Sequence, residues 1–127
     1  MSRQLFFLIE DDLDDQEIFR MALSGIDRDI ECMVFNNGIE ALEHLQKSNG
    51  RSPDFIFLDV NMPLMNGVAC LKEIRKMENL AHTKIFMFST SSDNKVVNTA
   101  KELGATGFII KPPSLSVLQQ KLTEVII

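Results

Sequence analysis

Five short apolar runs, each followed by a segment in which apolar residues recur at helical spacing, limit what this chain can fold into more than any other feature. The runs lie at residues 4–9, 31–35, 55–58, 84–88 and 107–110. Runs of this length indicate strands buried on both faces, and their alternation with helices is typical of βα units around a parallel sheet. We therefore predict an α/β fold of the (βα)5 type, a doubly wound parallel five-stranded sheet in a three-layer sandwich.

Capping residues and apolar spacing locate the helices between these runs. Asp12 or Asp14 can cap a helix after the first run, where acidic residues also suit the positive end of the helix dipole. Helical spacing places Ile18, Met21 and Ala22 on one face of that helix. We expect these three residues to face the sheet.

Length and composition bound the class of protein. A chain of 127 residues with 45% hydrophobic content can build one compact core, so we expect a single domain over residues 1–127 with no effector domain. A net charge of −5 argues against direct nucleic-acid binding. The first apolar run is too short for a signal peptide or a membrane span, so a cytoplasmic location is the default expectation. Cys32 and Cys70 lack zinc-ligand spacing and are expected to be core residues.

Carboxylates stand at the ends of two predicted strands. Asp59 follows the run at 55–58, and Glu10, Asp11 and Asp12 follow the run at 4–9. Taken alone, Asp59 fits an ordinary turn equally well. Because ligands bind in a crevice beyond the carboxyl ends of parallel strands, the two acidic strand ends could converge on one site. Clustered carboxylates raise each other's pKa unless a cation neutralises them, so such a site implies a bound metal ion or a basic partner.

Two further polar residues follow the last two runs. Ser89 comes after residues 84–88 and Lys111 after residues 107–110, which places both at the same predicted edge. A carboxylate nucleophile, a divalent ion held by carboxylates, a lysine and a hydroxyl together suit the acceptance of a phosphoryl group. Mg²⁺ fits this chemistry because it commonly takes one or two carboxylates and keeps several waters.

With these residues in place, the chain resembles the receiver domains of the two-component response regulators over its whole length. The motifs that carry the resemblance are LIEDD at 8–12, LDVNMP at 58–63 with Gly67, FST at 88–90, and GATGFIIKP at 104–112. Each motif is weak alone, but their order and their positions at strand ends are highly specific. The resemblance implies a flavodoxin-like sheet with the strand order 2-1-3-4-5.

The resemblance also implies a role for each site residue. Asp59 would be the phosphoacceptor, and Ser89 and Lys111 would bind the phosphoryl oxygens. Charge alone does not choose among the three acids after the first strand, but the resemblance selects the first two. The ligands that it implies for Mg²⁺ or Mn²⁺ are Glu10, Asp11, Asp59 and the backbone carbonyl of Asn61.

Further family features map onto other positions. Phe108, together with Ser89, matches the residues that couple phosphorylation to a conformational switch, although core packing explains a Phe there as well. Asn61 and Ser91 match positions that tune the lifetime of the phosphoryl group. The family often has a cis peptide bond before the proline that follows its lysine, which makes Lys111-Pro112 a candidate cis bond.

Acidic residues beyond the selected pair have a simpler interpretation. We interpret Asp12, Asp14 and Asp15 as capping residues or as partners of the helix dipole rather than as site residues.

Two alternatives stay in view. A haloacid dehalogenase-type phosphatase or phosphotransferase also places an aspartate after an apolar strand, but it needs a second Asp where this chain has Asn61. A receiver-like interaction module that works without phosphorylation is disfavoured by the intact acids and by Lys111.

The expected function is that of a stand-alone response regulator in two-component signalling. It would take a phosphoryl group from a sensor histidine kinase or a histidine phosphotransfer protein onto Asp59, and act as a switch or phosphorelay carrier toward a downstream protein target. We expect no membrane or nucleic-acid partner, and a monomer or weak homodimer. Beyond its own phosphorylation and slow autodephosphorylation, we expect no enzymatic activity.

Overall fold

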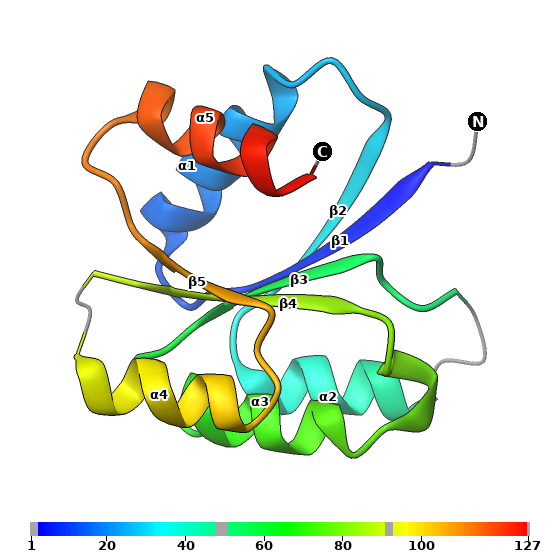
Figure 1. The fold of residues 1–127 in the computed structure, drawn as a ribbon. Coiled ribbons are helices and arrows are strands. Elements are labelled where there is room, and N and C mark those ends of the chain that lie inside the picture. Colours follow the sequence, from blue (N-terminus) through cyan, green and yellow to red (C-terminus); the bar gives the residue numbers. More distant parts are fainter. Residues whose placement is uncertain (1–2, 48–50, 91–92, 127) are drawn as a thin grey trace.

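A five-stranded parallel sheet forms the middle layer of the molecule in a computed structural model that describes residues 3–47, 51–90 and 93–126 (Figure 1). The strand order is β2-β1-β3-β4-β5. Neighbouring strands run parallel throughout. The strands are β1 (Gln4–Ile9), β2 (Ile30–Phe35), β3 (Phe55–Asp59), β4 (Lys84–Ser89) and β5 (Gly107–Ile110). The predicted fold class and strand order are confirmed.

The helices cover both faces of the sheet. Figure 1 shows α1 (Leu13–Ser24) and α5 (Leu115–Ile126) on one face. The helices α2 (Gly38–Lys47), α3 (Gly67–Arg75) and α4 (Asn94–Glu102) lie on the other face, and a short 3₁₀ helix, η1 (Glu78–Leu80), follows α3. None of the described helices is both long and apolar enough to cross a membrane.

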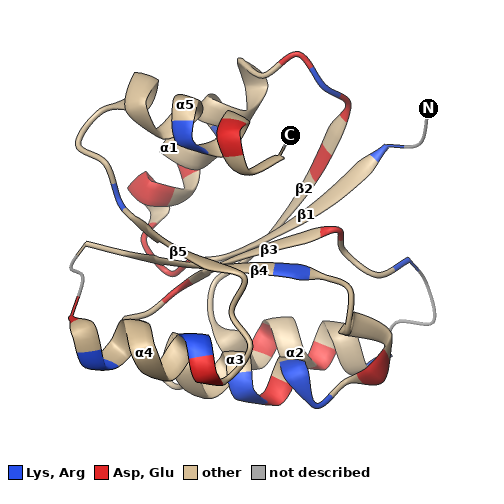
Figure 2. Ribbon diagram, in the orientation of Figure 1, with Lys and Arg blue, Asp and Glu red and all other residues tan. Residues whose placement is uncertain are grey.

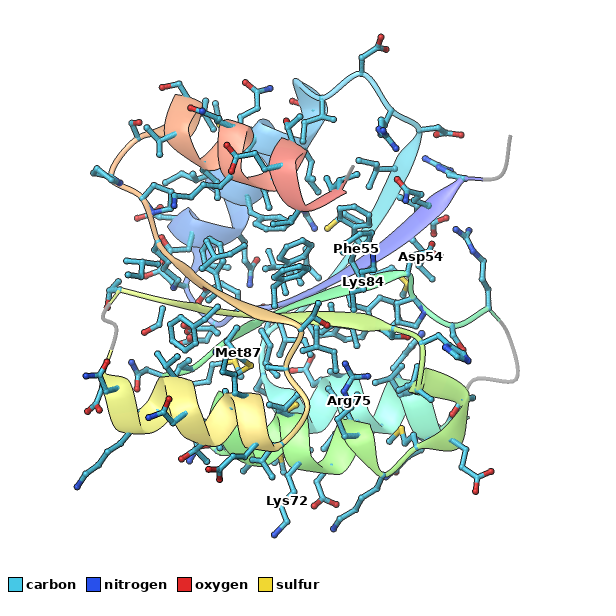
Figure 3. The ribbon with its side chains drawn as sticks, viewed as in Figure 1. Asp54, Phe55, Lys72, Arg75, Lys84 and Met87 are labelled. Atoms are coloured by element: carbon cyan, nitrogen blue, oxygen red, sulfur yellow. The ribbon has the colours of Figure 1, made fainter. Side chains whose placement is uncertain are left out.

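Alternation along the strands divides the core into two halves. Successive side chains of a strand point to opposite faces, so Phe7 and Met87 pack under α2–α4 while Phe6 and Phe55 pack under α1 and α5. Figure 3 shows Phe55 and Met87 on these opposite sides of the sheet. The α1/α5 half is rich in phenylalanine, and its rings stack at centroid distances such as 5.8 Å between Phe57 and Phe86. Aromatic packing of this kind adds to the burial of apolar area.

The buried face of α1 differs from the one expected. Ala22 is buried as expected, but Ile18 and Met21 are 41% and 50% exposed. Phe19 and Leu23 are buried instead, and the Phe19 ring lies 5.0 Å from that of Phe57. The two candidate faces are one residue apart on the helix, and the one that carries the larger aromatic side chain buries more apolar area against the phenylalanine layer.

The cysteines agree with the interpretation from sequence. Both are free, with Cys70 buried in the core and Cys32 half-buried on β2.

The loop between β3 and α3 contains a strained residue. Leu64 has φ of 69°, a left-handed conformation that costs a residue with a Cβ atom about 1–2 kcal/mol. The N–H of Met65 donates to the Pro63 carbonyl at 2.7 Å, which closes a three-residue turn around Leu64. The Leu64 side chain is 77% exposed, so little burial compensates for the strain.

Leu64→Asn should therefore stabilise the protein. Asn tolerates the left-handed region, so we expect the free energy of unfolding in urea to rise by about 0.5–1 kcal/mol. Leu13→Asn is the matched control, because Leu13 is 72% exposed and lies at the start of α1. A loss of stability in Leu64→Asn equal to that in Leu13→Asn would contradict the assignment of strain to Leu64.

Candidate functional site

The carboxyl ends of β1, β3, β4 and β5 bring four of the predicted site residues to one edge of the sheet. Glu10 follows β1, Asp59 and Ser89 end β3 and β4, and Lys111 follows β5. Figure 2 shows acidic segments after β1, at the start of α1 and at the end of β3, at the same edge as the basic segment after β5. Backbone pairing continues there, because the Lys111 N–H donates to the Ser89 carbonyl at 2.6 Å. Residues far apart in sequence are thus held by the sheet itself.

Three carboxylates form a compact cluster at this edge. One oxygen from each of Glu10, Asp11 and Asp59 lies within 4.8 Å of the others. Glu10 and Asp59 are buried, with 1% and 5% exposure, whereas Asp11 is exposed to solvent. Hard oxygen ligands with an open side suit a divalent cation that keeps part of its water shell. The main chain of Asn61 follows two residues after Asp59, and its part in metal binding stays a prediction.

Lys111 lies at the centre of the acids. Its Nζ lies 2.7 Å from Glu10 Oε1, 2.8 Å from Asp15 Oδ2 and 3.3 Å from Asp59 Oδ1. Its side chain is 13% exposed, so this ammonium is largely shielded from water. The contacts join β1, β3, α1 and the segment after β5 through a single cation.

Asp15 is the residue that the sequence analysis missed. It was interpreted as a partner of the helix dipole, but its carboxylate pairs with Lys111. Asp12 does have the capping role, since its side chain accepts a hydrogen bond from the Asp15 N–H at 3.0 Å. With the cap at Asp12, Asp15 lies in the first turn of α1, where side chains lean toward the helix N-terminus and so toward the site. The direction of side chains in the first turn was therefore the feature of the sequence that could have identified Asp15 as a site residue.

Burial and charge shift the pKa values of this group. Burial raises the pKa of Glu10 from 4.5 to about 7, although its hydrogen bond with Lys111 opposes the shift. Burial also raises the pKa of Asp59, and again the charge of Lys111 opposes it. Burial alone would lower the pKa of Lys111, but the hydrogen bonds to Asp15 and Glu10 raise it above its ordinary value. The buried carboxylates are therefore short of positive charge, which a bound cation would supply.

Neighbouring residues hold Glu10 in place. The buried Gln16 side chain on α1 donates to the Glu10 carbonyl at 2.7 Å and to Asn36 Oδ1 at 2.9 Å. The second Glu10 oxygen accepts the Asp12 N–H at 3.2 Å. Both Glu10 side-chain oxygens therefore accept hydrogen bonds, one from the Lys111 ammonium and one from the Asp12 N–H.

Gly67 allows α3 to approach Asp59. Its N–H donates to the Val60 carbonyl at 2.8 Å, and Asn66 caps the helix by accepting the Ala69 N–H at 2.9 Å. A Cβ atom at Gly67 would overlap the Asp59 carbonyl oxygen and lie 2.9 Å from Val60 Cα. Because both obstacles are backbone atoms, neither can move aside cheaply.

Ser89 and Phe108 lie on adjacent strands behind the carboxylates. Ser89 is 2% exposed and pairs in register with Ile110, one residue before Lys111. Phe108 pairs with Met87, is half-buried and packs against the core under α2–α4. The switching roles of Ser89 and Phe108 stay predictions.

The structure decides one question that the sequence left open, and another position falls outside the described part of the chain. The Lys111-Pro112 peptide bond is trans, and Lys111 reaches the acids in that form. Ser91 lies outside the described residues.

Comparisons with known proteins agree with one another. A family model described as the response regulator receiver domain matches residues 6–123. The chemotaxis protein CheY-3 of Vibrio cholerae is 32% identical over 119 residues, which cover 89% of this chain and 87% of that protein. The probable C4-dicarboxylate response regulator DctR of Bacillus subtilis is 30% identical over 117 residues, covering 92% of this chain and 50% of that protein.

Solved structures share the fold closely. The phosphorylated cyanobacterial phytochrome response regulator RcpA is 27% identical with a TM-score of 0.89, over 98% of this chain and 91% of that chain. The Mn²⁺-bound form of response regulator Rcp1 is 25% identical with a TM-score of 0.85, over 96% of this chain and 91% of that chain.

The packing at Gly67 predicts that adding a single methyl group there lowers the stability of the protein. Gly67→Ala should lower the free energy of unfolding by about 1–3 kcal/mol, because backbone atoms of Asp59 and Val60 occupy the space. Gly25→Ala is the control, since its Cβ would meet only the flexible end of the Gln119 side chain, and we expect a change below about 1 kcal/mol. Equal effects in the two variants would contradict the close approach at Gly67.

The raised pKa of Glu10 predicts how stability depends on pH without metal. Between pH 4.5 and about 7 the folded protein keeps a proton on Glu10 that the unfolded chain has released. In EDTA, the free energy of unfolding should therefore fall by on the order of 1–3 kcal/mol as the pH rises through this window. Glu10→Gln should flatten this slope, whereas Glu17→Gln, an exposed acid on α1, should leave it in place. If Glu10→Gln leaves the dependence of stability on pH unchanged, the group that holds the proton between pH 4.5 and about 7 is not Glu10.

Proposed function

This chain belongs to the response regulator receiver domains, and on that premise we propose that Asp59 accepts a phosphoryl group from a histidine kinase or a histidine phosphotransfer protein in a Mg²⁺-dependent reaction. The observation that carries the proposal is the convergence of Glu10, Asp11 and Asp59, with the Lys111 ammonium in contact with Glu10 and Asp59. The chain would act as a signalling switch or phosphorelay carrier. No match favours a phosphatase of the haloacid dehalogenase type or a module that ignores phosphorylation.

The positions of the side chains support the following chemistry. An Asp59 carboxylate oxygen attacks the phosphorus of a phosphohistidine, an O–P bond forms, and the P–N bond breaks. The imidazole leaves with the electron pair of that bond. The ammonium of Lys111 and the hydroxyl of Ser89 bind oxygens of the transferred phosphoryl group. Both groups thereby stabilise the negative charge on these oxygens during transfer to Asp59.

A divalent ion completes the proposed site. Glu10, Asp11, Asp59 and the Asn61 backbone carbonyl would hold it, and the bound ion would offset negative charge on the transferred oxygens. The carboxylate set suits Mg²⁺ and Mn²⁺ alike. A related regulator, Rcp1, is known in a Mn²⁺-bound form, which supports binding of a divalent metal ion by this chain.

The transferred group would alter the surface beyond the site. It carries about −2 charges where the Asp59 carboxylate carried one negative charge, which draws the Lys111 ammonium and the Ser89 hydroxyl toward Asp59. Phe108 lies on β5, pairs with Met87 of β4 and packs against the core under α2–α4, so its packing can follow the shift. We infer that the surface formed by α4, β5 and α5 carries the signal to a downstream protein.

The setting of the reaction follows from the family. Sensor histidine kinases or phosphotransfer proteins are the proposed donors, and a cytoplasmic monomer or weak homodimer is the proposed form of the protein. Beyond its own phosphorylation and the slow loss of its phosphoryl group, we propose no enzymatic activity.

Intact mass spectrometry after incubation with acetyl phosphate tests the acceptor. The native chain should gain the mass of one phosphoryl group in Mg²⁺ and almost none in EDTA, and Asp59→Asn should gain almost none in either. Asp27→Asn, which changes an exposed acid remote from the cluster, should label like the native chain. Equal labelling of Asp59→Asn and native protein would refute Asp59 as the acceptor, and steady turnover of many phosphate esters would favour a phosphatase.

A further inference from the structure

The ammonium of Lys111 makes more contacts than the proposed reaction requires. A lysine ammonium has three N–H donors, and here three carboxylates surround it, from Glu10, Asp15 and Asp59. Glu10 and Asp59 belong to the cluster that can hold a metal ion, whereas Asp15 does not. Among the three described acids that contact Lys111, Asp15 is therefore the one that lies outside the cluster able to hold a metal ion.

The geometry shows what Asp15 does for Lys111. Its oxygen lies 2.8 Å from the ammonium, closer than the 3.3 Å contact to Asp59. The Asp15 backbone is fixed by the first turn of α1, because its N–H donates to the capping Asp12 side chain. Its carboxylate is 36% exposed, less buried than that of Glu10, so it pairs with Lys111 at a lower desolvation cost.

We propose that Asp15 is a positioning residue, which holds the Lys111 ammonium beside Asp59 after the metal ion has engaged Glu10. The inference deepens the proposed function and rests on it. When Glu10 turns to the metal, Lys111 loses its shortest contact, and its flexible four-carbon stem would sample other orientations. The ion pair with Asp15 restricts that motion. Lys111 then already points at the position where the phosphoryl oxygens arrive, so less ordering is needed during transfer.

Asp15→Asn is the direct test, and Asp14→Asn is its matched control. Both remove one negative charge from the same turn of α1, but Asp14 is exposed and its side chain has no part in the Lys111 contacts. The Asn side chain keeps the volume of Asp15 and leaves its backbone N–H bound to Asp12. Thermal unfolding of both variants should match that of the native protein to within a few degrees.

The labelling rate with acetyl phosphate gives the first readout. At saturating donor and Mg²⁺, we expect Asp15→Asn to label Asp59 at least about fivefold more slowly than Asp14→Asn, with a similar half-saturating concentration of acetyl phosphate. Equal maximal labelling rates in the two variants would overturn the proposal, and so would a change in the half-saturating concentration of acetyl phosphate alone. If the native chain itself is not labelled, the proposed function fails, which is a distinct result.

Coupling between Asp15 and Lys111 gives the second readout. If Asp15 acts through Lys111, then Asp15→Asn should cause no additional slowing in a Lys111→Met background. Equal slowing in both backgrounds would mean that Asp15 acts on the site independently, and would overturn the proposal.

A third readout needs Mg²⁺, so that Glu10 is engaged by the metal, but no phosphoryl donor. Proton exchange on the Lys111 ammonium, followed by ¹⁵N-edited NMR, should be slow in the native protein and in Asp14→Asn, because water reaches a held and shielded ammonium poorly. In Asp15→Asn the exchange should be faster by about tenfold or more. If proton exchange in Asp15→Asn is as slow as in the native protein, the ion pair with Asp15 is not what restrains the Lys111 ammonium.

Discussion

A buried ammonium shared among carboxylates is the interaction on which the rest of the site depends. Glu10 and Asp59 are almost fully removed from water, and isolated charges in such positions are strongly unfavourable. Lys111 makes their burial tolerable by contacting both, but one cation does not balance the acids present. The remaining negative charge is what makes the site suited to a divalent ion, and so to phosphoryl chemistry. Stability is therefore favoured by full neutralisation of these buried acids, whereas metal binding depends on the negative charge that Lys111 leaves unbalanced.

The parallel sheet supplies the precision that this arrangement needs. Glu10, Asp59 and Lys111 lie at the ends of three different strands, and hydrogen bonds such as Lys111 N–H to the Ser89 carbonyl continue the strand pairing up to the site. Gly67 adds a second restraint, because the N-terminus of α3 packs directly on the backbone of Asp59. Side chains carried on rigid elements hold their geometry better than side chains on free loops.

Much of this structure could be predicted from the sequence, and the failures have physical causes. Strand positions followed from apolar runs because strands buried on both faces carry no competing polar signal. The buried face of α1 was misjudged because Ile18 and Met21 have helical spacing as good as that of Phe19 and Leu23, and only packing against Phe57 decides between them. Local pattern cannot contain that information.

Local sequence pattern was equally unable to predict the ion pairs of the site. Asp15 and Lys111 are 96 positions apart, so no local pattern in the sequence shows that they form an ion pair. Glu10 and Lys111 are separated by 101 positions, and β5 is the last strand to be synthesised. A growing polypeptide therefore holds its acids long before it acquires the lysine that balances them. The charges at this edge therefore balance only once β5 has joined the sheet, so the assembly of the site is tied to the completion of the fold.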